Sequence, residues 1–120
     1  MKILVCEDDQ MMVKAIEHKL KSEGYDVDIA VDGNEAFEMI QRSDYDLIMT
    51  DLLMPFIGGL EFINKVRNEL VLKIPIIVLS GLNSEDSIIE AFKLGADDYI
   101  TKPFSPNEVS IRVKRLLIRR

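Results

Sequence analysis

The chain has 120 residues, of which 48% are hydrophobic and 30% charged, and its net charge at neutral pH is −6. That length is enough for one domain that buries a single core without disulfides or a structural metal. The acidic balance argues against a nucleic-acid-binding surface, because contacts with phosphates need a basic face. Cys6 is the only cysteine, which excludes internal disulfides and cysteine-based metal clusters.

The sequence shows no targeting or membrane segment. No apolar stretch approaches membrane-spanning length, and the amino terminus leads into a predicted strand rather than a signal peptide. We therefore expect a cytoplasmic protein that does not bind membranes. Linkers, internal repeats and low-complexity tracts are absent, so residues 1–120 are predicted to form one domain.

Strand-like and helix-like segments alternate along the chain. The predicted strands are short and rich in Ile, Val and Leu, namely Lys2–Cys6, Val27–Ala30, Asp46–Thr50, Ile74–Ser80 and Asp98–Thr101. The first, third and fourth are nearly continuous apolar runs, as expected of strands covered on both faces. Together with five helical segments, they predict an α/β fold in which a parallel sheet lies between two layers of helices.

Apolar stripes and end signals define the predicted helices. The stripes recur with helical spacing, namely Met12, Ala15, Ile16 and Leu20 in the first helix, Leu60, Ile63, Val66 and Leu70 in the third, and Val109, Val113, Leu116 and Leu117 in the last. Gly24 and Gly95 stand where two helices should end in the left-handed conformation. Residues 105–108 (Ser-Pro-Asn-Glu) form a capping box, so the last helix is expected to begin at Pro106.

Polar side chains stand at the ends of four predicted strands. They are Glu7-Asp8-Asp9 after the first strand, Asp51 after the third, Ser80 at the end of the fourth, and Lys102 after the fifth, which also carries Tyr99. In an open parallel sheet, ligands bind beyond the carboxyl ends of the strands, where the strand order reverses. We therefore expect these groups to converge. Together they can hold a divalent metal and a phosphoryl group.

The carboxylates of Glu7, Asp8 and Asp51 would repel one another at close range, and a hard cation such as Mg²⁺ relieves that repulsion. Acidic residues after strands also cap the helices that follow them. We interpret Asp9 as such a cap. The other three are interpreted as a site for Mg²⁺ or Mn²⁺.

Asp51 is the candidate nucleophile. A carboxylate can accept a phosphoryl group when a metal and a cation screen its charge and that of the donor. Lys102 would supply the cation, and the Ser80 hydroxyl would bind a phosphoryl oxygen. A lone lysine at a strand end is usually a solvated residue, but Pro103 and the capping box fix the backbone here and aim the side chain. The Lys102–Pro103 bond is a candidate for the cis isomer.

Four motifs resemble, in order and spacing, those of the response-regulator receiver domains of the chemotaxis-regulator (CheY-like) superfamily. They are ILVCEDD at residues 3–9, LIMTDLLMP at 47–55 with two glycines at 58–59, IIVLSG at 76–81, and GADDYITKPF at 95–104. The resemblance covers essentially the whole chain. It implies a flavodoxin-like three-layer sandwich with strand order 2-1-3-4-5 and five helices.

The resemblance also implies how the acidic residues act. Asp51 would be phosphorylated by a sensor histidine kinase or a phosphotransfer protein. Asp8 and Asp51 would bind Mg²⁺ directly, together with the backbone carbonyl of Leu53, while Glu7 would act through water. Glu7 stands where the family more commonly has an aspartate, and glutamate is a frequent variant there.

For the remaining site residues, the resemblance implies a switch. Lys102 would pair with the phosphoryl group, and Ser80 and Tyr99 would change conformation to control an output partner or domain. The protein would then be a signalling switch that catalyses only its own phosphoryl transfer and dephosphorylation.

Two other interpretations remain open. A metal-dependent hydrolase with an aspartyl nucleophile would need a second acid two residues after Asp51, where Leu53 stands, and a cap for which no segment is long enough. A degenerate receiver would be an interaction module that takes no phosphate, although all the required residues are present.

A partner surface is predicted on the fourth helix, the fifth strand and the fifth helix. Its apolar candidates are Ile88, Ile89, Phe92, Ile111 and Ile118, and its charged candidates are Asp97, Asp98, Glu108, Arg112, Arg115 and Arg119. Aliphatic residues among arginines are typical of an interface. The segment at 95–106 also resembles the winged-helix transcription-factor subgroup, which forms homodimers on this face when phosphorylated.

In that subgroup an aspartate matching Asp97 or Asp98 pairs with the arginine matching Arg112 across the dimer. The glutamate matching Glu108 pairs with a base on the fourth helix. Here Ile88 occupies the position of that base.

Overall fold

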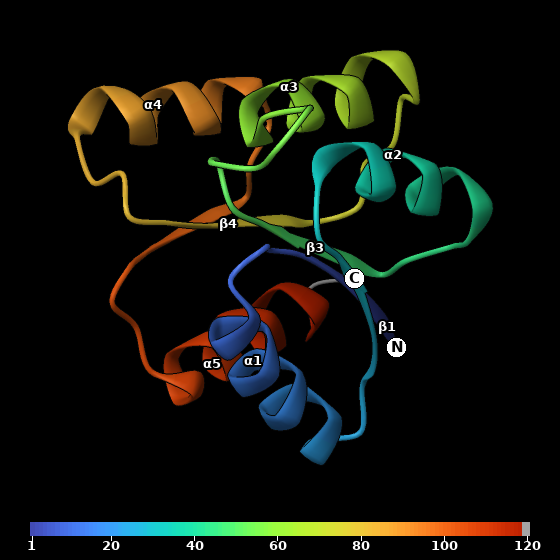
Figure 1. The fold of residues 1–120 in the computed structure, drawn as a ribbon, viewed down its shortest axis with the longest axis vertical. Coiled ribbons are helices and arrows are strands. Elements are labelled where there is room, and N and C mark those ends of the chain that lie inside the picture. The colour runs from blue at the N-terminus through green and yellow to red at the C-terminus, as the bar shows by residue number, and fades with distance from the viewer. Residues whose placement is uncertain (119–120) are drawn as a thin grey trace.

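The computed structural model describes residues 1–118, in which strands and helices alternate (Figure 1). The elements are β1 (Lys2–Cys6), α1 (Gln10–Ser22), β2 (Asp26–Ala30), α2 (Gly33–Arg42), β3 (Leu47–Thr50), α3 (Gly59–Asn64), η1 (Lys65–Glu69), β4 (Ile76–Ser80), α4 (Glu85–Leu94), β5 (Asp98–Thr101) and α5 (Pro106–Ile118). Here η1 is a π-helical turn that continues α3. In this part of the chain every helix is too short or too polar to cross a bilayer.

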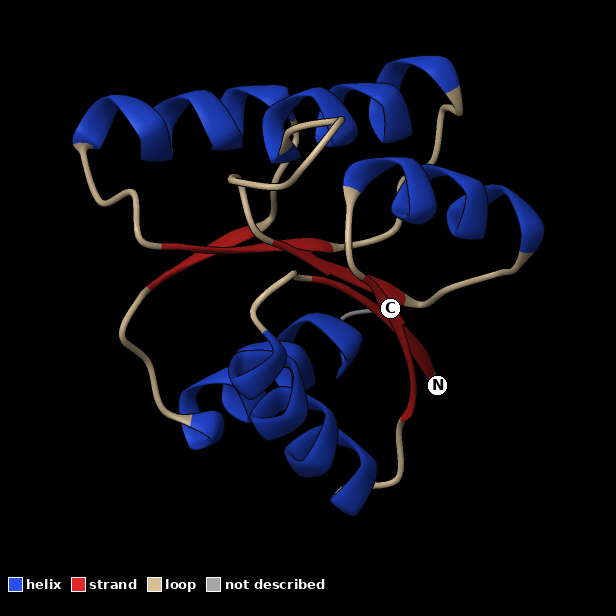
Figure 2. Ribbon diagram, viewed as in Figure 1, coloured by secondary structure: helices blue, strands red, loops and turns tan. Residues whose placement is uncertain are grey.

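All five strands are parallel and form one sheet in the order β2-β1-β3-β4-β5. Helices α2, α3 and α4 cover one face of the sheet, and α1 and α5 cover the other (Figure 2). The predicted flavodoxin-like three-layer sandwich is confirmed. Because β1 lies between β2 and β3, the strand order reverses at β1, and this reversal marks the ligand-binding edge of such sheets.

Each face of the sheet has its own apolar core. Successive residues of a strand point to opposite faces, so Leu4 packs with Phe62 on one side and Val5 with Ile16 on the other. All four side chains are fully buried. Cys6 is also buried, and burial raises the pKa of its thiol, in agreement with its interpretation as a small hydrophobe.

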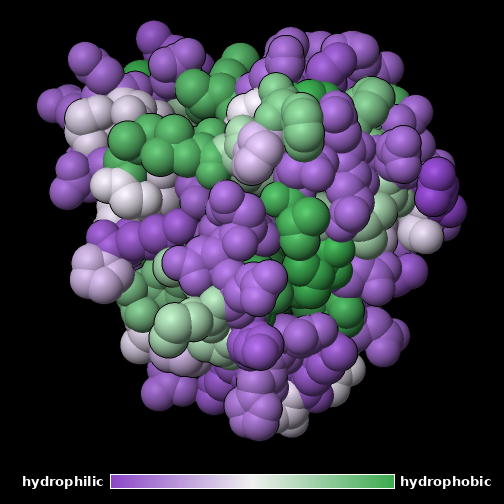
Figure 3. Space-filling view, in the orientation of Figure 1, coloured by the Kyte–Doolittle hydropathy of each residue, from purple (hydrophilic) through white to green (hydrophobic). Residues whose placement is uncertain are grey.

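The strand β2 forms one edge of the sheet, and its burial alternates more than that of β1 or β3. Figure 3 shows the molecule from the same side as Figure 1, with hydrophilic side chains over most of the helices. Apolar side chains are visible between the two helical layers in that view. The sheet is therefore covered on its faces and less completely at its edge.

The helix ends follow the predicted signals. Gly24 and Gly95 have φ angles of 91° and 118°, which place both in the left-handed region. The side chain of Asp9 caps α1 by accepting hydrogen bonds from two backbone N–H groups. The Ser105 hydroxyl oxygen accepts one at 3.1 Å in the first turn of α5, which begins at Pro106. The predictions for Gly24, Gly95, Asp9 and the start of α5 are confirmed. Of the predicted capping box, the bond to the Ser105 hydroxyl is observed, while the Glu108 side chain pairs with Arg112.

Several boundary and burial predictions need correction. β4 begins at Ile76 rather than Ile74, because Pro75 has no N–H group to give to a central strand. β3 begins one residue later than predicted and β2 one residue earlier. Of the predicted stripe in α1, only Ile16 and Leu20 are fully buried, and Ala15 is exposed.

The third helix is not uniformly α-helical, although its period predicted a single regular helix. The N–H of Leu70 donates to the carbonyl of Lys65 at 2.9 Å, which is the five-residue spacing of a π turn. Val66 is fully buried within this turn. The next residue, Arg67, reaches out of η1 toward the loops on either side.

The Arg67 side chain joins the segment after η1 to the loop between α4 and β5. Its Nη1 donates to the carbonyls of Leu72 and Ile74, both at 2.8 Å. Nε and Nη2 donate to the carbonyl of Gly95 at 3.1 and 2.8 Å, and Nη2 also reaches the Asp97 carboxylate at 3.0 Å. All five N–H groups of the guanidinium are therefore used.

Replacing Arg67 by methionine is expected to lower the free energy of unfolding by about 2–4 kcal/mol, because the loop carbonyls lose this donor and the Asp97 carboxylate loses its cationic partner. Urea unfolding followed by far-UV circular dichroism measures this. The control is Arg42→Met, because the ion pair of Arg42 with Glu38 is exposed and should contribute less than about 0.5 kcal/mol. Equal losses in the two variants would contradict the role given to Arg67.

Candidate functional site

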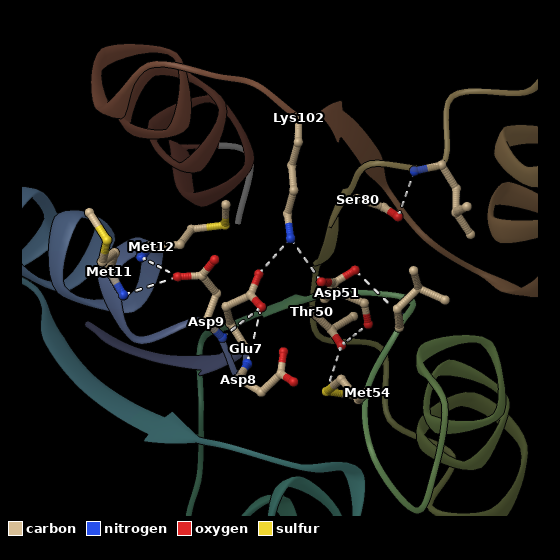
Figure 4. A network of polar contacts seen from close by, with 12 residues as sticks. Glu7, Asp8, Asp9, Met11, Met12, Thr50, Asp51, Met54, Ser80 and Lys102 are labelled. Carbon is tan, nitrogen blue, oxygen red and sulfur yellow. Dashed lines mark hydrogen bonds and ion pairs between the residues drawn. The ribbon is translucent and has the colours of Figure 1, made fainter.

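The candidate site lies where β1, β3, β4 and β5 end (Figure 4). Glu7 follows β1, Asp51 follows β3, Ser80 ends β4, and Lys102 follows β5. Parallel pairing aligns these ends, so residues as far apart as Glu7 and Lys102 come into contact. The convergence of polar groups that the strand ends predicted is therefore observed.

Lys102 lies between two acidic side chains. Its Nζ is 2.8 Å from Glu7 Oε1 and 2.8 Å from Asp51 Oδ2. The side chains of Glu7 and Asp51 are 1% and 7% exposed, so these charge-assisted hydrogen bonds are poorly screened by water. One ammonium shared by two carboxylates leaves excess negative charge at the site.

The pKa values at the site reflect this arrangement. Burial raises the pKa of Glu7 above its ordinary value and outweighs the hydrogen bonds from Lys102 and the backbone, which lower it. The nearby charge of Asp51 acts in the same direction as burial. Burial disfavours the charged form of Lys102, but its bonds to Asp51 and Glu7 prevail and raise its pKa. Lys102 therefore remains a cation at neutral pH.

The candidate metal site comprises Glu7, Asp8 and Asp51. One carboxylate oxygen of each lies within 4.8 Å of the others. Asp8 is exposed while the other two are buried, so a cation can enter from the solvent side. Backbone N–H groups of Asp8 and Asp9 donate to Glu7 Oε2 at 3.1 and 3.2 Å and fix that carboxylate. An all-oxygen set of this kind fits Mg²⁺ or Mn²⁺.

The loop after β3 carries the second half of the site. The Asp51 carboxylate accepts a hydrogen bond from the N–H of Leu53 at 3.1 Å, and the Asp51 N–H donates to the carbonyl of Cys6 at 3.1 Å. The buried Thr50 hydroxyl donates to the carbonyl of Asp51 at 2.9 Å and contacts the sulfur of Met54. The sequence reasoning missed Thr50, and its position directly before Asp51 was the available signal.

The two residues expected to form a switch share one partner. The buried Ser80 hydroxyl oxygen accepts a hydrogen bond from the N–H of Leu82 at 3.1 Å. The Tyr99 hydroxyl donates to the carbonyl of the same Leu82. Tyr99 itself is 8% exposed, so its ring is packed inward. The predicted cis isomer of the Lys102–Pro103 bond is present.

The predicted apolar partner surface is exposed in large part. Ile89 and Phe92 on α4 are 42% and 44% exposed, and Ile111 and Ile118 on α5 are 65% and 82% exposed. Ile88 differs from the prediction, because its side chain is half-buried and packs against the core under α4.

The charged residues expected at the same surface pair within the chain. Asp98 is buried and accepts hydrogen bonds from Arg112 at 2.7 Å and Arg115 at 2.9 Å. Glu108 pairs with Arg112 one turn away on α5, at 3.4 Å. Asp97 belongs to the hydrogen-bond network between the loops described above. The pairing of Arg112 with aspartate is therefore intrachain here, because α5 packs across the start of β5. Arg119 lies outside the described residues.

Comparison with known proteins identifies the family. The profile described as "Response regulator receiver domain" matches residues 3–114. The chain belongs to this family. The alkaline phosphatase synthesis transcriptional regulatory protein PhoP of Bacillus subtilis is 41% identical over 118 residues, which are 98% of this chain and 49% of that protein. The receiver chain thus spans about half the length of this relative.

Solved structures agree with this assignment. The receiver domain of the Francisella response regulator 1452 is 39% identical, with a TM-score of 0.92 over 98% of this chain and 97% of that one. The chemotaxis response regulator CheY4 of Vibrio cholerae is 32% identical, with a TM-score of 0.90 over 97% of this chain and 98% of that one. The receiver is therefore a domain of two-component signalling, in which such domains act as switches.

The charge of Asp8 provides a test of the acidic cluster. Asp8→Asn should raise the stability of the metal-free receiver by about 0.5 kcal/mol, since it removes a repulsive charge that solvent partly screens. It should also abolish the increase in melting temperature on adding Mg²⁺, because a ligand is lost. Differential scanning fluorimetry measures both effects.

Asp9→Asn is the matched control for Asp8→Asn. It removes the same charge one residue along the chain, and asparagine still caps α1. It should keep the Mg²⁺-induced increase. An increase that survived in Asp8→Asn would exclude Asp8 as a metal ligand.

Proposed function

We propose that residues 1–120 form a phosphoacceptor receiver that takes a phosphoryl group onto Asp51. The donor is a phosphohistidine presented by a sensor histidine kinase or a phosphotransfer protein. Mg²⁺ or Mn²⁺ is held by Asp8, Asp51 and the backbone carbonyl of Leu53, with Glu7 acting through water. When bound, the metal screens the charge of the transferring phosphoryl group.

In the transfer, an Asp51 carboxylate oxygen forms a bond to phosphorus while the nitrogen–phosphorus bond of the donor breaks. The imidazole leaves with the electron pair. Both oxygens of Asp51 are already held, one by the Leu53 N–H and one by Lys102, which limits the orientations of the nucleophile. Burial of Asp51 reduces screening of the developing charge.

The position of the Lys102 ammonium is the observation that carries this proposal. It lies 2.8 Å from the Asp51 carboxylate and 2.8 Å from Glu7. A new phosphoryl group adds nearly two negative charges beside it, and the side chain of Lys102 can turn toward them while β5 stays in place. A cation so placed beside the only aspartate at the end of β3 supports transfer onto Asp51.

The new charge would also change the contacts of Leu82. If the Ser80 hydroxyl turns to a phosphoryl oxygen, it gives up the hydrogen bond from the Leu82 N–H. The loop after β4 can then move, and Tyr99 loses its contact with the Leu82 carbonyl. Because one backbone residue serves both side chains, Ser80 and Tyr99 change together as two states of one cluster.

Mass spectrometry of the intact receiver tests the proposal. Incubation with a small acyl phosphate and Mg²⁺ should add one phosphoryl group, and Asp51→Asn or removal of Mg²⁺ by a chelator should prevent it. Lys102→Met is expected to slow the addition by about 100-fold or more, since it removes the screening cation. Turnover of the donor without an adduct would favour a hydrolase. Neither adduct nor turnover would favour a degenerate receiver.

The aspartyl phosphate of the phosphorylated receiver should hydrolyse slowly. Water must attack in line with the acyl phosphate, and polar neighbours could orient it. The side chains two positions after Asp51 and Ser80 are Leu53 and Leu82, which are 62% and 38% exposed and offer no hydrogen bond to water. Replacing both with glutamine should speed loss of phosphate by about tenfold. Decay within seconds in the unmodified receiver, or no change in the double variant, would contradict this.

Phosphorylation should also promote a homodimer through α4, β5 and α5. The exposed Ile111 and Ile118 would be buried between copies, while the arginines at the rim turn from Asp98 toward the partner. Sedimentation with beryllofluoride, a phosphate mimic, should show a dimer that Ile118→Glu abolishes. Val71→Glu, on the exposed segment after η1, is the control. A receiver that remains monomeric at high micromolar concentration would contradict this.

A further inference from the structure

The loop that carries Asp51, residues 51–58, rests against the β2–α2 turn, which here means residues 31–35 and so includes the first three residues of α2. The N–H of Gly33 donates to the carbonyl of Pro55 at 3.2 Å. A Cβ at position 33 would lie 2.1 Å from the carbonyl oxygen of Ile57 and 2.5 Å from its Cβ. Both atoms are fixed to the backbone and cannot rotate away, so only glycine allows the two segments to approach this closely.

The turn that presents Gly33 is itself held firmly. The N–H of Glu35 donates to the side chain of Asp32 at 2.8 Å, and the N–H of Val31 donates to the side chain of Glu35 at 3.2 Å. These two bonds resemble a capping box at the start of α2, except that the Glu35 side chain accepts from Val31, the residue before the N-cap Asp32. These hydrogen bonds therefore hold the backbone around Gly33 in place.

The loop also makes a close contact with Gly59, and one of its residues, Phe56, has an unfavourable backbone conformation. A Cβ on Gly59 would lie 2.2 Å from the carbonyl oxygen of Asp51, and the Gly59 N–H donates to the carbonyl of Leu52 at 2.9 Å. Phe56 has a φ of 68°, which is unfavourable for a residue with a side chain. The loop keeps this shape because surrounding backbone holds it on both sides.

We propose that the β2–α2 turn is a brace for the phosphorylation loop, with Gly33 as a positioning residue for the metal site. The inference rests on the proposed function, in which Asp51 and the Leu53 carbonyl bind the metal. Gly33 touches neither of them. It acts through residues 55–57, which lie directly after Leu53 in the loop. Displacing those residues alters how the loop presents its oxygen ligands.

The test measures metal binding rather than phosphorylation. Mn²⁺ binding is followed by the loss of its free EPR signal on titration with each variant. Gly33→Ala should weaken Mn²⁺ binding by about tenfold, as is usual when the support of metal ligands is disturbed. Unchanged Mn²⁺ affinity in a folded Gly33→Ala receiver would overturn the proposal. If the parent receiver itself bound no Mn²⁺, the metal site of the proposed function would fail instead.

Two further glycines provide the controls. Gly58→Ala makes the same change within the loop, but the nearest atom to its new Cβ is 3.7 Å away and its φ of −68° suits alanine. It should bind Mn²⁺ like the parent. Gly24→Ala meets no atom within 4 Å but strains a φ of 91°, so it should lower the melting temperature without changing Mn²⁺ affinity. If Gly24→Ala also bound Mn²⁺ more weakly, the weaker binding of Gly33→Ala would reflect general destabilisation, and the proposal would be wrong.

Glu35 offers a second route if Gly33→Ala does not fold. Glu35→Ala removes the acceptor for the Val31 N–H, whereas Glu35→Gln keeps the oxygen that accepts from Val31 and removes only the charge. If the β2–α2 turn supports the loop, Mn²⁺ binding should be weaker in Glu35→Ala than in Glu35→Gln. Equal affinities in these two variants would overturn the proposal.

Discussion

The structure depends on one electrostatic constraint, the burial of two carboxylates around a single ammonium at the carboxyl ends of the strands. Glu7 and Asp51 are almost completely buried, and Lys102 bridges them. Removing charge from water is costly, so the arrangement requires backbone donors to Glu7 and a fixed loop behind Asp51. The remaining excess of negative charge makes the site receptive to a cation.

The surroundings of this site divide into fixed and less constrained parts. The end of α4 and the start of β5 are tied down, because Arg67 holds the loop between them and Asp98 holds two arginines of α5. The opposite end of α4 follows a loop whose contacts with the site run through Leu82. In the proposed switch, a change at Ser80 would therefore act on the beginning of α4 rather than on its end.

The face formed by α4 and α5 combines two properties that suit a regulated interface. Ile89, Phe92, Ile111 and Ile118 are exposed, which favours association. Arg112 and Arg115 are already engaged with Asp98 in the same chain, so they are not free to recruit a partner. Association on this face would require those ion pairs to be exchanged, and such an exchange is one means by which a conformational change can control binding.

The sequence by itself determined the order of the elements, the parallel sheet and the convergence of most polar groups of the candidate site. Apolar runs of strand length and helical stripes require burial, and residues that end strands must meet at one edge of a parallel sheet. For this reason the sequence correctly predicted that Glu7, Asp51 and Lys102 lie close together. The capping signals at Gly95 and Ser105 were also predicted correctly, because each residue acts on backbone groups close to it in the sequence.

Only the tertiary structure decided which polar groups pair and which apolar groups stay exposed. The engagement of Asp98 with Arg112, the reach of Arg67 across two loops, and the partial burial of Ile88 depend on how helices pack over strands. The close contact of Gly33 with Ile57 joins segments that no local pattern relates. Local sequence encodes periodicity and turn geometry, whereas these contacts are set by distances between elements that form only once both cores are packed.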